Sequence, residues 1–337
     1  MRAAKLVEPK KISIQEVDTP KIGKDDVLIK IRAAGICGTD LHIYQGHRPD
    51  IALPRVMGHE LSGEIAEAGE SVTELSAGDH VVIDPVIYCG TCPACRKGKR
   101  NVCSSIMCFG CQTDGGFQDY VKVKARDAYK ISKKIPFSHA AMAEPFSIAA
   151  EILERSDPAE GDTVVVYGAG TIGLCVLQAL KMKGAKVLMA DLVDSRLERA
   201  KKLGADMTVN TSAQDLKDVV MSSFSEGGAD IVIEAVGASK LADEAVEIVA
   251  RGGRIVVIGF DKTELHVSEF TFVRPGIEIR GSVLNNEKFP QVVTWMEQGK
   301  IHPESMISKE YPLEKIGQAF EDILADPKSV IKVIVTF

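Results

Sequence analysis

Short apolar runs separated by turn residues dominate the first 135 residues of the chain. The clearest runs are Val27–Ile31, Leu61–Ile65, Val81–Ile83 and Tyr120–Val123. Glycine and aspartate stand between them, and close spacing of this kind is typical of β-strands rather than helices. This part of the sequence therefore predicts a β-rich, barrel-like domain.

From Ser138 onward, strand-like and helix-like segments alternate. The expected strands are Thr163–Tyr167, Lys186–Ala190, Ile231–Ala235 and Arg254–Ile258. The expected helices are Thr171–Lys183, Ser195–Leu203 and a stretch near Leu241–Ala250. Regular alternation predicts a parallel sheet with right-handed crossovers. After about Glu287 the pattern predicts helices near Phe289–Glu297 and Leu313–Leu324, and then a strand over Val330–Val335.

Composition narrows the class of protein. The 337 residues favour two domains, and 45% hydrophobic with 26% charged residues indicates a globular protein with a real core. The net charge of −6, without a basic cluster, argues against a nucleic-acid partner. No apolar run reaches the roughly 18 residues that span a membrane. No apolar segment follows Met1–Lys5, so no signal peptide is expected. Eight cysteines, mostly assigned to metal below, fit a reducing cytoplasm.

Four cysteines form a compact set that we call the cysteine lobe, residues 89–103. Cys89, Cys92, Cys95 and Cys103 have two x2 spacings and one x7 spacing, which let four thiolates surround one ion. A closed set of four cysteines is typical of structural zinc. An iron–sulfur cluster is the alternative, but the ferredoxin run continues with a cysteine after three residues and then a proline, whereas here Ser104 follows the fourth cysteine.

A glycine-rich turn follows the predicted strand Thr163–Tyr167. Its sequence is Gly168-Ala169-Gly170-Thr171-Ile172-Gly173, and it leads into a predicted helix. The first glycine permits the tight turn, the second lets a pyrophosphate approach, and the third lets the helix pack on the strand. Asp191 ends the next strand, where a carboxylate accepts the ribose hydroxyls of NAD and repels the 2′-phosphate of NADP. The candidate cofactor-binding residues are Gly168, Gly170, Thr171, Ile172, Gly173, Asp191, Arg196 and Val283.

A second metal site is expected around Cys37 and His59. A thiolate, an imidazole and a carboxylate suit zinc, and three protein ligands leave a position open for substrate. The carboxylate is either Glu60 or Glu144. Asp40 is placed to accept the second ring N–H of His59. Taken singly, each of these residues also has an ordinary structural explanation.

Together these motifs resemble those of the zinc-dependent medium-chain dehydrogenases, over essentially the whole chain. The matching segments are Cys37–Asp40, Gly58–Glu60, the cysteine lobe, Gly115–Phe117, Glu144–Pro145 and Gly168–Gly173. The resemblance is strongest to the polyol, threonine and sugar-acid branch, in which Cys37, His59 and Glu60 or Glu144 match the catalytic zinc ligands. An additional pair, Cys108 and Cys111, departs from the family pattern.

The resemblance implies an α/β fold with two domains. Residues 1–150 and 288–337 would form a GroES-like catalytic domain, and residues 151–287 a Rossmann domain with a doubly wound parallel sheet. It also implies two zinc ions per chain, one of them catalytic and in the cleft between the domains, NAD as cofactor, and a homodimer or homotetramer.

The expected reaction is oxidation of a secondary alcohol to a ketone. Zinc would act on the alcohol as a Lewis acid, and NAD would accept the hydride. Thr39 and His42 resemble the relay that carries the proton away in alcohol dehydrogenases. The segment Ser282–Pro290 resembles hexonate 5-dehydrogenases, and Arg48 is either a partner for a substrate carboxylate or a solvated surface charge.

Several other functions stay open at this point. The expected substrate is a polyol or a sugar acid such as L-gulonate, with L-threonine 3-dehydrogenase and sorbitol dehydrogenase as alternatives. A dinucleotide-binding sensor without catalysis would not need the open metal site. A zinc-free NADPH-dependent quinone or enoyl reductase would need neither the metal ligands nor Asp191.

Overall fold

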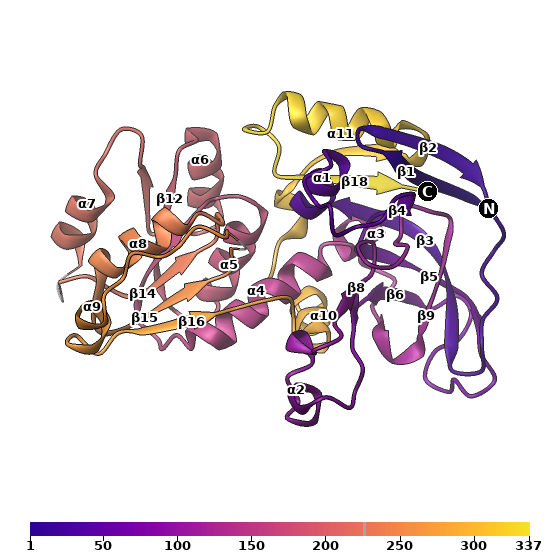
Figure 1. Ribbon diagram of the computed structural model, residues 1–337, viewed down its shortest axis with the longest axis horizontal. Coiled ribbons are helices and arrows are strands. Elements are labelled where there is room, and N and C mark those ends of the chain that lie inside the picture. The colour runs from indigo at the N-terminus through magenta and orange to yellow at the C-terminus, as the bar shows by residue number, and fades with distance from the viewer. Residues whose placement is uncertain (225–226, 260) are drawn as a thin grey trace. The chain divides into compact units, whose positions relative to one another are not determined.

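The computed structural model describes residues 1–224, 227–259 and 261–337. The chain divides into two compact units, of which the first contains Met1–Ser147 and Asn285–Phe337 and the second contains Ile148–Leu284 (Figure 1). The chain thus leaves the first unit once and returns to it for its last segment. In the described part of the chain, no helix combines the length and apolar character needed to cross a membrane.

The first unit is built around a sheet whose strands run in the order β10-β6-β5-β3-β18-β17, with β9 paired to β3. Their bounds are β3 Asp26–Ile36, β5 Glu60–Ala68, β6 His80–Ile83, β9 Tyr120–Lys124, β10 Ala128–Lys130, β17 Ile307–Pro312 and β18 Lys332–Thr336. A second sheet has the order β2-β1-β4, with β1 Arg2–Glu8, β2 Lys11–Glu16 and β4 Arg55–Val56. A short pair joins β7 Val86–Ile87 to β8 Met107–Cys108.

The first unit also contains short helices and 3₁₀ turns. They are α1 Gly38–Tyr44, α2 Pro93–Arg96, α3 Phe137–Ala140, α10 Phe289–Glu297 and α11 Ile316–Ala325, with 3₁₀ turns at Arg100–Val102, Ala125–Asp127, Pro303–Ser305 and Leu313–Lys315. The α11 side chain Phe320 is fully buried and lies 4.7 Å from the ring of Tyr44 and 6.2 Å from that of Phe117, between centroids. The last segment of the chain therefore completes the core of the first unit.

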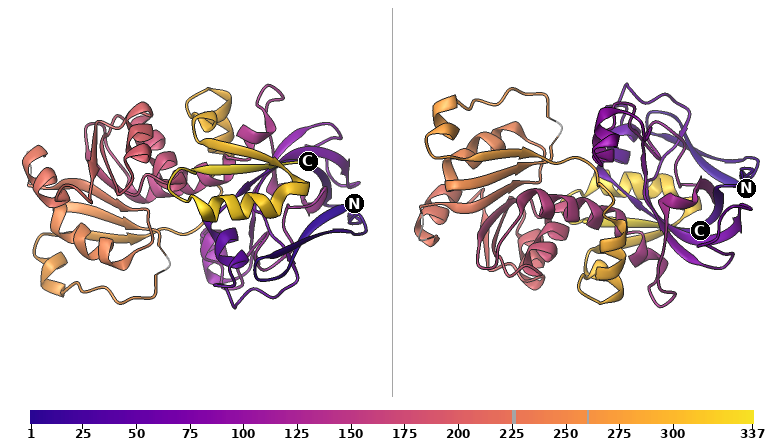
Figure 2. Two further views of the ribbon diagram at one scale, coloured as in Figure 1. Left: turned by 90° about the horizontal axis from the view of Figure 1, so that it is seen from above. Right: turned by 90° about the horizontal axis from the view of Figure 1, so that it is seen from below.

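The second unit contains a parallel sheet with the strand order β13-β12-β11-β14-β15-β16. The strands are β11 Thr163–Tyr167, β12 Lys186–Asp191, β13 Met207–Asn210, β14 Ala229–Glu234, β15 Val249–Val257 and β16 Glu278–Gly281. The helices are α5 Thr171–Lys181, α6 Asp194–Lys202, α7 Leu216–Ser223, α8 Ser239–Ile248 and α9 Glu269–Val273, and Figure 2 shows helices on both sides of this sheet. When the six strands are numbered by their order in the sequence, they lie across the sheet in the order 3-2-1-4-5-6, which is the Rossmann arrangement.

This arrangement confirms the predicted fold class, and the differences in detail have physical reasons. In the second unit, the two strands that the sequence did not reveal, β13 and β16, are the edges of the sheet. Edge strands are buried on fewer sides, so they lack the apolar run that marks a central strand. The predicted helix over residues 241–250 ends at Ile248, because Val249 already pairs with Ala229 in the sheet.

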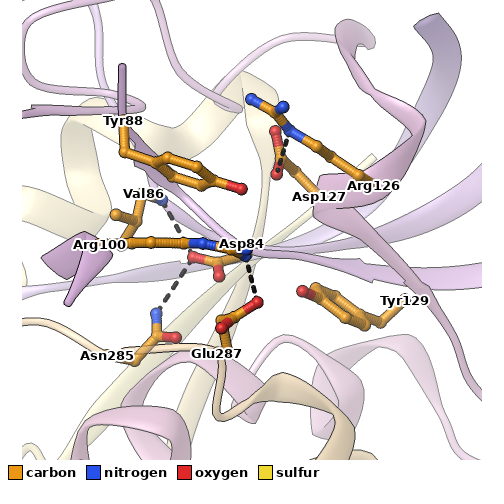
Figure 3. Close-up of a pocket in the computed structure, with 9 residues that line it drawn as sticks. All are labelled: Asp84, Val86, Tyr88, Arg100, Arg126, Asp127, Tyr129, Asn285 and Glu287. Atoms are coloured by element: carbon orange, nitrogen blue, oxygen red, sulfur yellow. Dashed lines mark hydrogen bonds and ion pairs between the residues drawn. The ribbon is translucent and has the colours of Figure 1, made fainter. Parts of the chain in front are cut away.

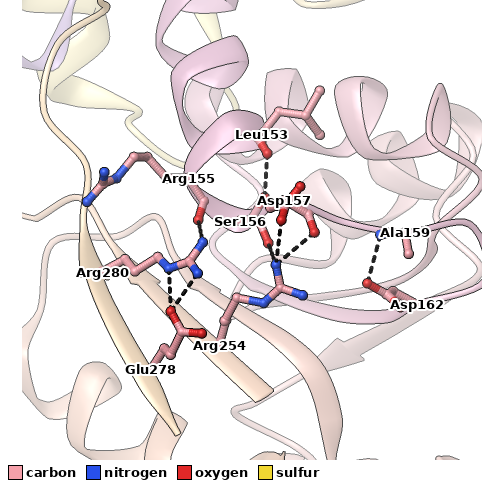
Figure 4. A network of polar contacts seen from close by, with 9 residues as sticks. All are labelled: Leu153, Arg155, Ser156, Asp157, Ala159, Asp162, Arg254, Glu278 and Arg280. Atoms are coloured by element: carbon pink, nitrogen blue, oxygen red, sulfur yellow. Dashed lines mark hydrogen bonds and ion pairs between the residues drawn. The ribbon is translucent and has the colours of Figure 1, made fainter. Parts of the chain in front are cut away.

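Helix α4, Ala143–Ser156, ends in a network of arginine contacts within the second unit (Figure 4). The Arg254 guanidinium donates to the carbonyl oxygens of Ser156 and Asp157, each at 2.8 Å. Arg280 donates to the carbonyl oxygen of Arg155 at 2.9 Å. The last carbonyls of a helix have no partner within the helix and carry partial negative charge, so these two guanidinium groups fasten α4 to β15 and β16.

Candidate active site

In the first unit, strand β3 ends where its two neighbours β5 and β18 begin, and this brings the predicted metal ligands together. Strand β3 pairs with β5 through Gly35 opposite Glu60, and with β18 through Ile36 opposite Val333. Cys37 follows β3 directly, His59 precedes β5, and Lys332 begins β18. Residues that are far apart in the sequence therefore meet at one edge of the sheet.

Cys37, His59 and Glu60 form a group whose ligand atoms all lie within 4.8 Å of one another. His59 and Glu60 are buried, and Cys37 is partly buried. Gly35 makes room for the carboxylate, because a Cβ atom there would lie 1.9 Å from Glu60 Oε2. A partly buried thiol with a buried imidazole and a buried carboxylate at this separation is a donor set that fits zinc.

His59 carries a polar atom without a hydrogen-bond partner, which supports the metal assignment. Its Nδ1 is buried and makes no hydrogen bond among the described residues. Burial alone would lower the pKa of His59, but the carboxylate of Asp40 and the thiol of Cys37 raise it well above its usual value. An imidazole surrounded by acidic groups is a place where a cation relieves negative charge.

Asp40 does not make the hydrogen bond to His59 that the sequence suggested. Its Oδ1 lies 3.8 Å from His59 Nδ1, which exceeds hydrogen-bond distance. Its two oxygens instead accept the backbone N–H groups of Cys37 at 2.9 Å and Gly58 at 3.1 Å. Asp40 is fully buried. It therefore fixes the backbone next to two candidate ligands rather than the ring itself.

The two candidate carboxylates have different surroundings. Glu60 is held by Lys332, whose Nζ donates to both carboxylate oxygens at 2.5 and 2.7 Å. Glu144, in the first turn of α4, is also buried but lies outside the group formed by Cys37, His59 and Glu60. Burial raises the pKa of Glu144 to about 8, against the opposing charge of His59. The geometry thus favours Glu60 as third ligand.

Lys332 is a functional candidate that the sequence analysis missed. It is buried, with 2% relative exposure, and it also donates to the carbonyl oxygen of Ile36 at 3.0 Å. A signal was present, since this lysine interrupts the otherwise apolar run Val330–Val335. A lysine inside a buried strand needs a buried partner, but the sequence does not say which acid supplies it.

The three remaining candidates of the first unit are Thr39 and His42, which lie in α1, and Arg48, which follows this helix. Cys37 is the residue before the helix, and Thr39 and His42 are three residues apart, so they share a helix face. Thr39 is half-buried and His42 is exposed, with its ring 6.1 Å from that of His47. Arg48 is partly exposed, and its guanidinium is paired with both carboxylate oxygens of Asp50, at 2.7 and 2.6 Å.

The cysteine lobe lies between β7 and β8 of the first unit, and its four sulfur atoms lie within 4.8 Å of one another. The Sγ atoms of Cys89 and Cys103 are 3.4 Å apart, and those of Cys92 and Cys103 are 3.9 Å apart. A tetrahedral zinc with Zn–S bonds of about 2.3 Å sets its sulfurs ~3.8 Å apart. Backbone N–H groups lower the pKa of Cys92 to about 5 and that of Cys89 to about 7. The lobe therefore fits one zinc ion and is too small for a cluster.

The extra cysteines lie near the candidate ligands. Strand β8 ends at Cys108, and Cys111 follows in a turn. The interaction between the two thiols raises the pKa of Cys108 and lowers that of Cys111, and the charge of His59 contributes to the second shift.

In the second unit the glycine-rich turn joins β11 to α5. Gly168 has φ +92°, which suits glycine, and its N–H donates to the carbonyl oxygen of Ala190 at 2.7 Å. A Cβ atom on Gly173 would lie 1.8 Å from the Gly168 carbonyl oxygen, so only glycine permits this close packing. Gly170 precedes the first residue of α5, and Thr171 and Ile172 form the first turn of that helix.

Asp191 stands at the end of β12 beside this turn. Its carboxylate accepts the N–H groups of Ala169 at 2.7 Å and Val193 at 2.9 Å. Arg196, in α6, approaches the Asp191 carboxylate to 4.0 Å. Val283 is half-buried near the end of the second unit. The aspartate therefore stabilises the turn at the same point where it would meet a ribose.

A polar cavity of about 350 Å³ in the first unit was not foreseen from the sequence (Figure 3). Tyr88 lines this cavity, and the guanidinium carbons of Arg100 and Arg126 each lie 4.9 Å from the centroid of its ring. Burial raises the pKa of both Asp84 and Asp127 to about 6. None of its lining residues is a candidate ligand or cofactor-binding residue. The cavity and the group of Cys37, His59 and Glu60 therefore share no residue.

Comparison with known proteins identifies the family. The profile described as the alcohol dehydrogenase GroES-like domain matches residues 23–133, and the profile described as zinc-binding dehydrogenase matches residues 171–298. The chain belongs to the zinc-dependent medium-chain alcohol dehydrogenase family. The resemblance stated from the motifs is thus confirmed, and so is the enzyme class.

Among similar members of the family are two proteins of Escherichia coli. The starvation-sensing protein RspB is 38% identical, over 100% of this chain and 99% of its own length. L-galactonate-5-dehydrogenase is 33% identical, over 98% of this chain and 97% of its own length. A crystal structure of RspB with the cofactor NADH superposes with a TM-score of 0.95 at 37% identity, covering 100% of this chain and 99% of the other.

Proposed function

We propose that this dehydrogenase transfers a hydride from a secondary alcohol of a polyol or sugar acid to NAD and releases a ketone. The observation that carries the proposal is the buried group of Cys37, His59 and Glu60 at the ends of adjacent strands. In this assignment the first unit is the catalytic domain and the second unit is the NAD-binding domain. The four sulfurs of the cysteine lobe hold a second, structural zinc ion.

Cys37, His59 and Glu60 are the residues that would hold the catalytic zinc. A zinc ion there would supply Lewis acidity, which lowers the pKa of an alcohol. Asp40 keeps the Cys37 and Gly58 backbone in place through its two accepted hydrogen bonds. Glu144 is buried nearby, where burial raises its pKa to about 8, and it is a candidate for alternate ligation.

Thr39 and His42 are proposed to carry the proton of the alcohol to solvent. Thr39 lies two residues beyond Cys37, on the same helix face as His42. The exposure of His42 supports a role at the outer end of the relay, where an imidazole exchanges protons with water.

The glycine-rich turn is proposed to bind the pyrophosphate of NAD. The start of α5 presents free N–H groups and the positive end of the helix dipole to phosphate. The nicotinamide, when bound, would accept the hydride. Arg196 and Val283 are further proposed contacts of the cofactor.

We expect NAD to be preferred over NADP because of Asp191. A 2′-phosphate would meet the Asp191 carboxylate, whose side chain is only 9% exposed, and like charges repel strongly where water is scarce. Replacing Asp191 with Ser should lower kcat/KM for NAD about tenfold and reduce the preference for NAD over NADP by a larger factor. Initial rates with each dinucleotide measure both quantities.

Arg196 offers the matched control for this change. It lies 4.0 Å from Asp191, so Arg196→Gln keeps the carboxylate and removes the cation beside it. That variant should keep the preference for NAD. Equal use of both dinucleotides by the unaltered enzyme would show that Asp191 does not select the cofactor.

The substrate class is the finer part of the proposal. Support comes from the likeness to L-galactonate-5-dehydrogenase, whose name describes a sugar acid as substrate, and from the presence of Arg48 after the relay. Activity with NAD on a panel of hexonates, neutral polyols and L-threonine tests it directly. Best activity with L-threonine or a simple primary alcohol would contradict this substrate class.

Arg48 should distinguish a sugar acid from a neutral polyol. Its guanidinium already holds the Asp50 carboxylate with two hydrogen bonds, which shows that its geometry suits a carboxylate. We expect Arg48→Ala to raise KM for a hexonate such as gulonate about tenfold or more, while KM for sorbitol changes little.

The partner of Arg48 supplies the control. Asp50→Asn releases the guanidinium without removing it, so KM for the hexonate should stay the same or fall. If Arg48→Ala raises both KM values equally, the arginine has a structural role through Asp50.

A further inference from the structure

Cys108 and Cys111 are the ends of a tight turn. The N–H of Cys111 donates to the carbonyl oxygen of Cys108 at 3.1 Å, and Gly110 at the third position has φ +79°. This is the arrangement of a type II β-turn, whose first and last Cα atoms lie less than about 7 Å apart. Cα separations of roughly 4.4–6.8 Å are those that a disulfide bridges. The two thiols are thus placed for a bond to each other without a long movement of the chain.

The two cysteines differ in access. Cys108 is partly exposed, and Cys111 is buried at 4%. Cys108 is therefore the more exposed residue of the pair. Two cysteines separated by two residues are typical of redox-active C-x2-C sequences.

The turn presses against the segment that carries a candidate metal ligand. A Cβ atom on Gly110 would lie 2.6 Å from the Gly58 carbonyl oxygen, and one on Gly115 would lie 2.3 Å from the same atom. Gly116 N–H donates to the Gly58 carbonyl oxygen at 2.8 Å. His59 is the next residue. The backbone of Gly110 and Gly115 thus packs directly on the backbone of Gly58. The turn has little room to move unless Gly58 moves as well.

The C-x2-C pair does not fit a third metal site. In residues 1–224, 227–259 and 261–337, the groups of three or more close ligand side chains are the cysteine lobe and the set Cys37, His59 and Glu60. The pair belongs to neither group, and two thiolates alone do not complete the four-coordinate shell that zinc takes. The eight cysteines are free thiols in this structure.

We propose that Cys108 and Cys111 are a redox-active dithiol that an external disulfide of the glutathione class oxidises to an intramolecular disulfide, and that this oxidation slows the enzyme by displacing His59. One thiolate of the pair attacks one sulfur of the external disulfide, and the first thiol leaves. The other thiolate then attacks the mixed disulfide at the sulfur of the first cysteine, and the second thiol leaves. Two electrons and the two thiol protons pass to the external disulfide, which becomes two thiols.

Disulfide formation can be tested whatever the substrate proves to be. The zinc-loaded protein is incubated with oxidised or reduced glutathione, alkylated, and digested with chymotrypsin, which cleaves after Phe109, between the two cysteines. We expect peptides ending at Phe109 and starting at Gly110 to stay linked in the oxidised sample and to separate after reduction. Hydrogen exchange of residues 57–61 should change with oxidation. Turnover should fall about tenfold or more and recover on reduction, since small displacements of reacting groups have large effects on rate.

Variants separate this dithiol from the other cysteines. Each variant is compared in its own oxidised and reduced states, so differences in folding do not enter the comparison. Cys108→Ser and Cys111→Ser should abolish the linked peptides and the response to oxidised glutathione, whereas Cys175→Ser, a change at a buried cysteine of α5, should retain both. Recovery of Cys108 and Cys111 as separately alkylated residues overturns the proposal, and so does a link to Cys103. Linked peptides with unchanged exchange at residues 57–61 overturn the coupling to His59.

Discussion

Replacing Cys37 with Ser is expected to abolish turnover almost completely while leaving the fold intact. The change removes the soft ligand from a group of three whose donor atoms lie within 4.8 Å of one another. Lewis-acid assistance from a metal contributes several kcal/mol, so we expect kcat to fall about a thousandfold or more. Metal analysis should return one zinc per chain in place of two, and circular dichroism should be unchanged.

Cys92→Ser is the complementary variant. Cys92 belongs to the cysteine lobe, so its loss should also remove one zinc but should lower the melting temperature of the protein, because structural zinc contributes folding free energy. Cys175→Ala, a change at a buried cysteine outside both groups, serves as the matched control and should keep both ions. A Cys37→Ser protein that keeps two zinc ions and full activity would exclude Cys37 as a ligand.

The sequence predicted most of the sheet structure because central strands have their own apolar signature. Val164, Val165 and Val166 of β11 are fully buried, and their run is visible without any knowledge of partners. Met207–Asn210 and Glu278–Gly281 become strands only because a central strand offers them an edge to pair with. That information lies in the partner strand, so a local pattern cannot reveal it.

The same distinction applies to the site. Cys37, His59, Glu60 and Glu144 could be named from their residue types and short motifs. The choice between the two glutamates depends on the pairing of Gly35 with Glu60, which the sequence does not contain in readable form. The partner of Glu60 was missed because Lys332 is 272 residues away in the chain. Short-range motifs therefore named the candidate ligands, and long-range pairing determines how these side chains are held.

The second large effect is expected from Lys332, whose removal should destabilise the zinc-free protein. The Lys332 and Glu60 side chains are 3% and 1% exposed, and their charged atoms are 2.5 Å apart. Breaking such a pair by removing one partner leaves an uncompensated buried charge, which typically costs about 3–5 kcal/mol. Lys332→Met should lower the free energy of unfolding by that amount in the metal-free protein, as measured by denaturant titration.

Two further variants test whether the loss comes from the unpaired charge. In the double variant Glu60→Gln with Lys332→Met, no buried charge is left alone, so much of the stability should return. Lys309→Met is the matched control on the neighbouring strand β17, where the lysine side chain is 53% exposed, and its effect should stay within about 0.5 kcal/mol. A loss of equal size in the single and double variants would show that packing, rather than charge, explains the role of Lys332.

The pH dependence of the pair follows from the direction of the lysine shift. Burial alone would lower the pKa of Lys332, but the charges of Glu60 and Cys37 raise it above its usual value. A group whose pKa is raised by folding contributes its full stabilisation below its unfolded pKa, about 10.4 for lysine, and loses it as pH rises through the folded value. In the zinc-free protein, the stability difference between wild type and Lys332→Met should therefore persist as pH rises above neutral and shrink only in strongly alkaline solution. A difference that disappears as pH rises from about 6 to about 8 would show that Lys332 is neutral in the fold.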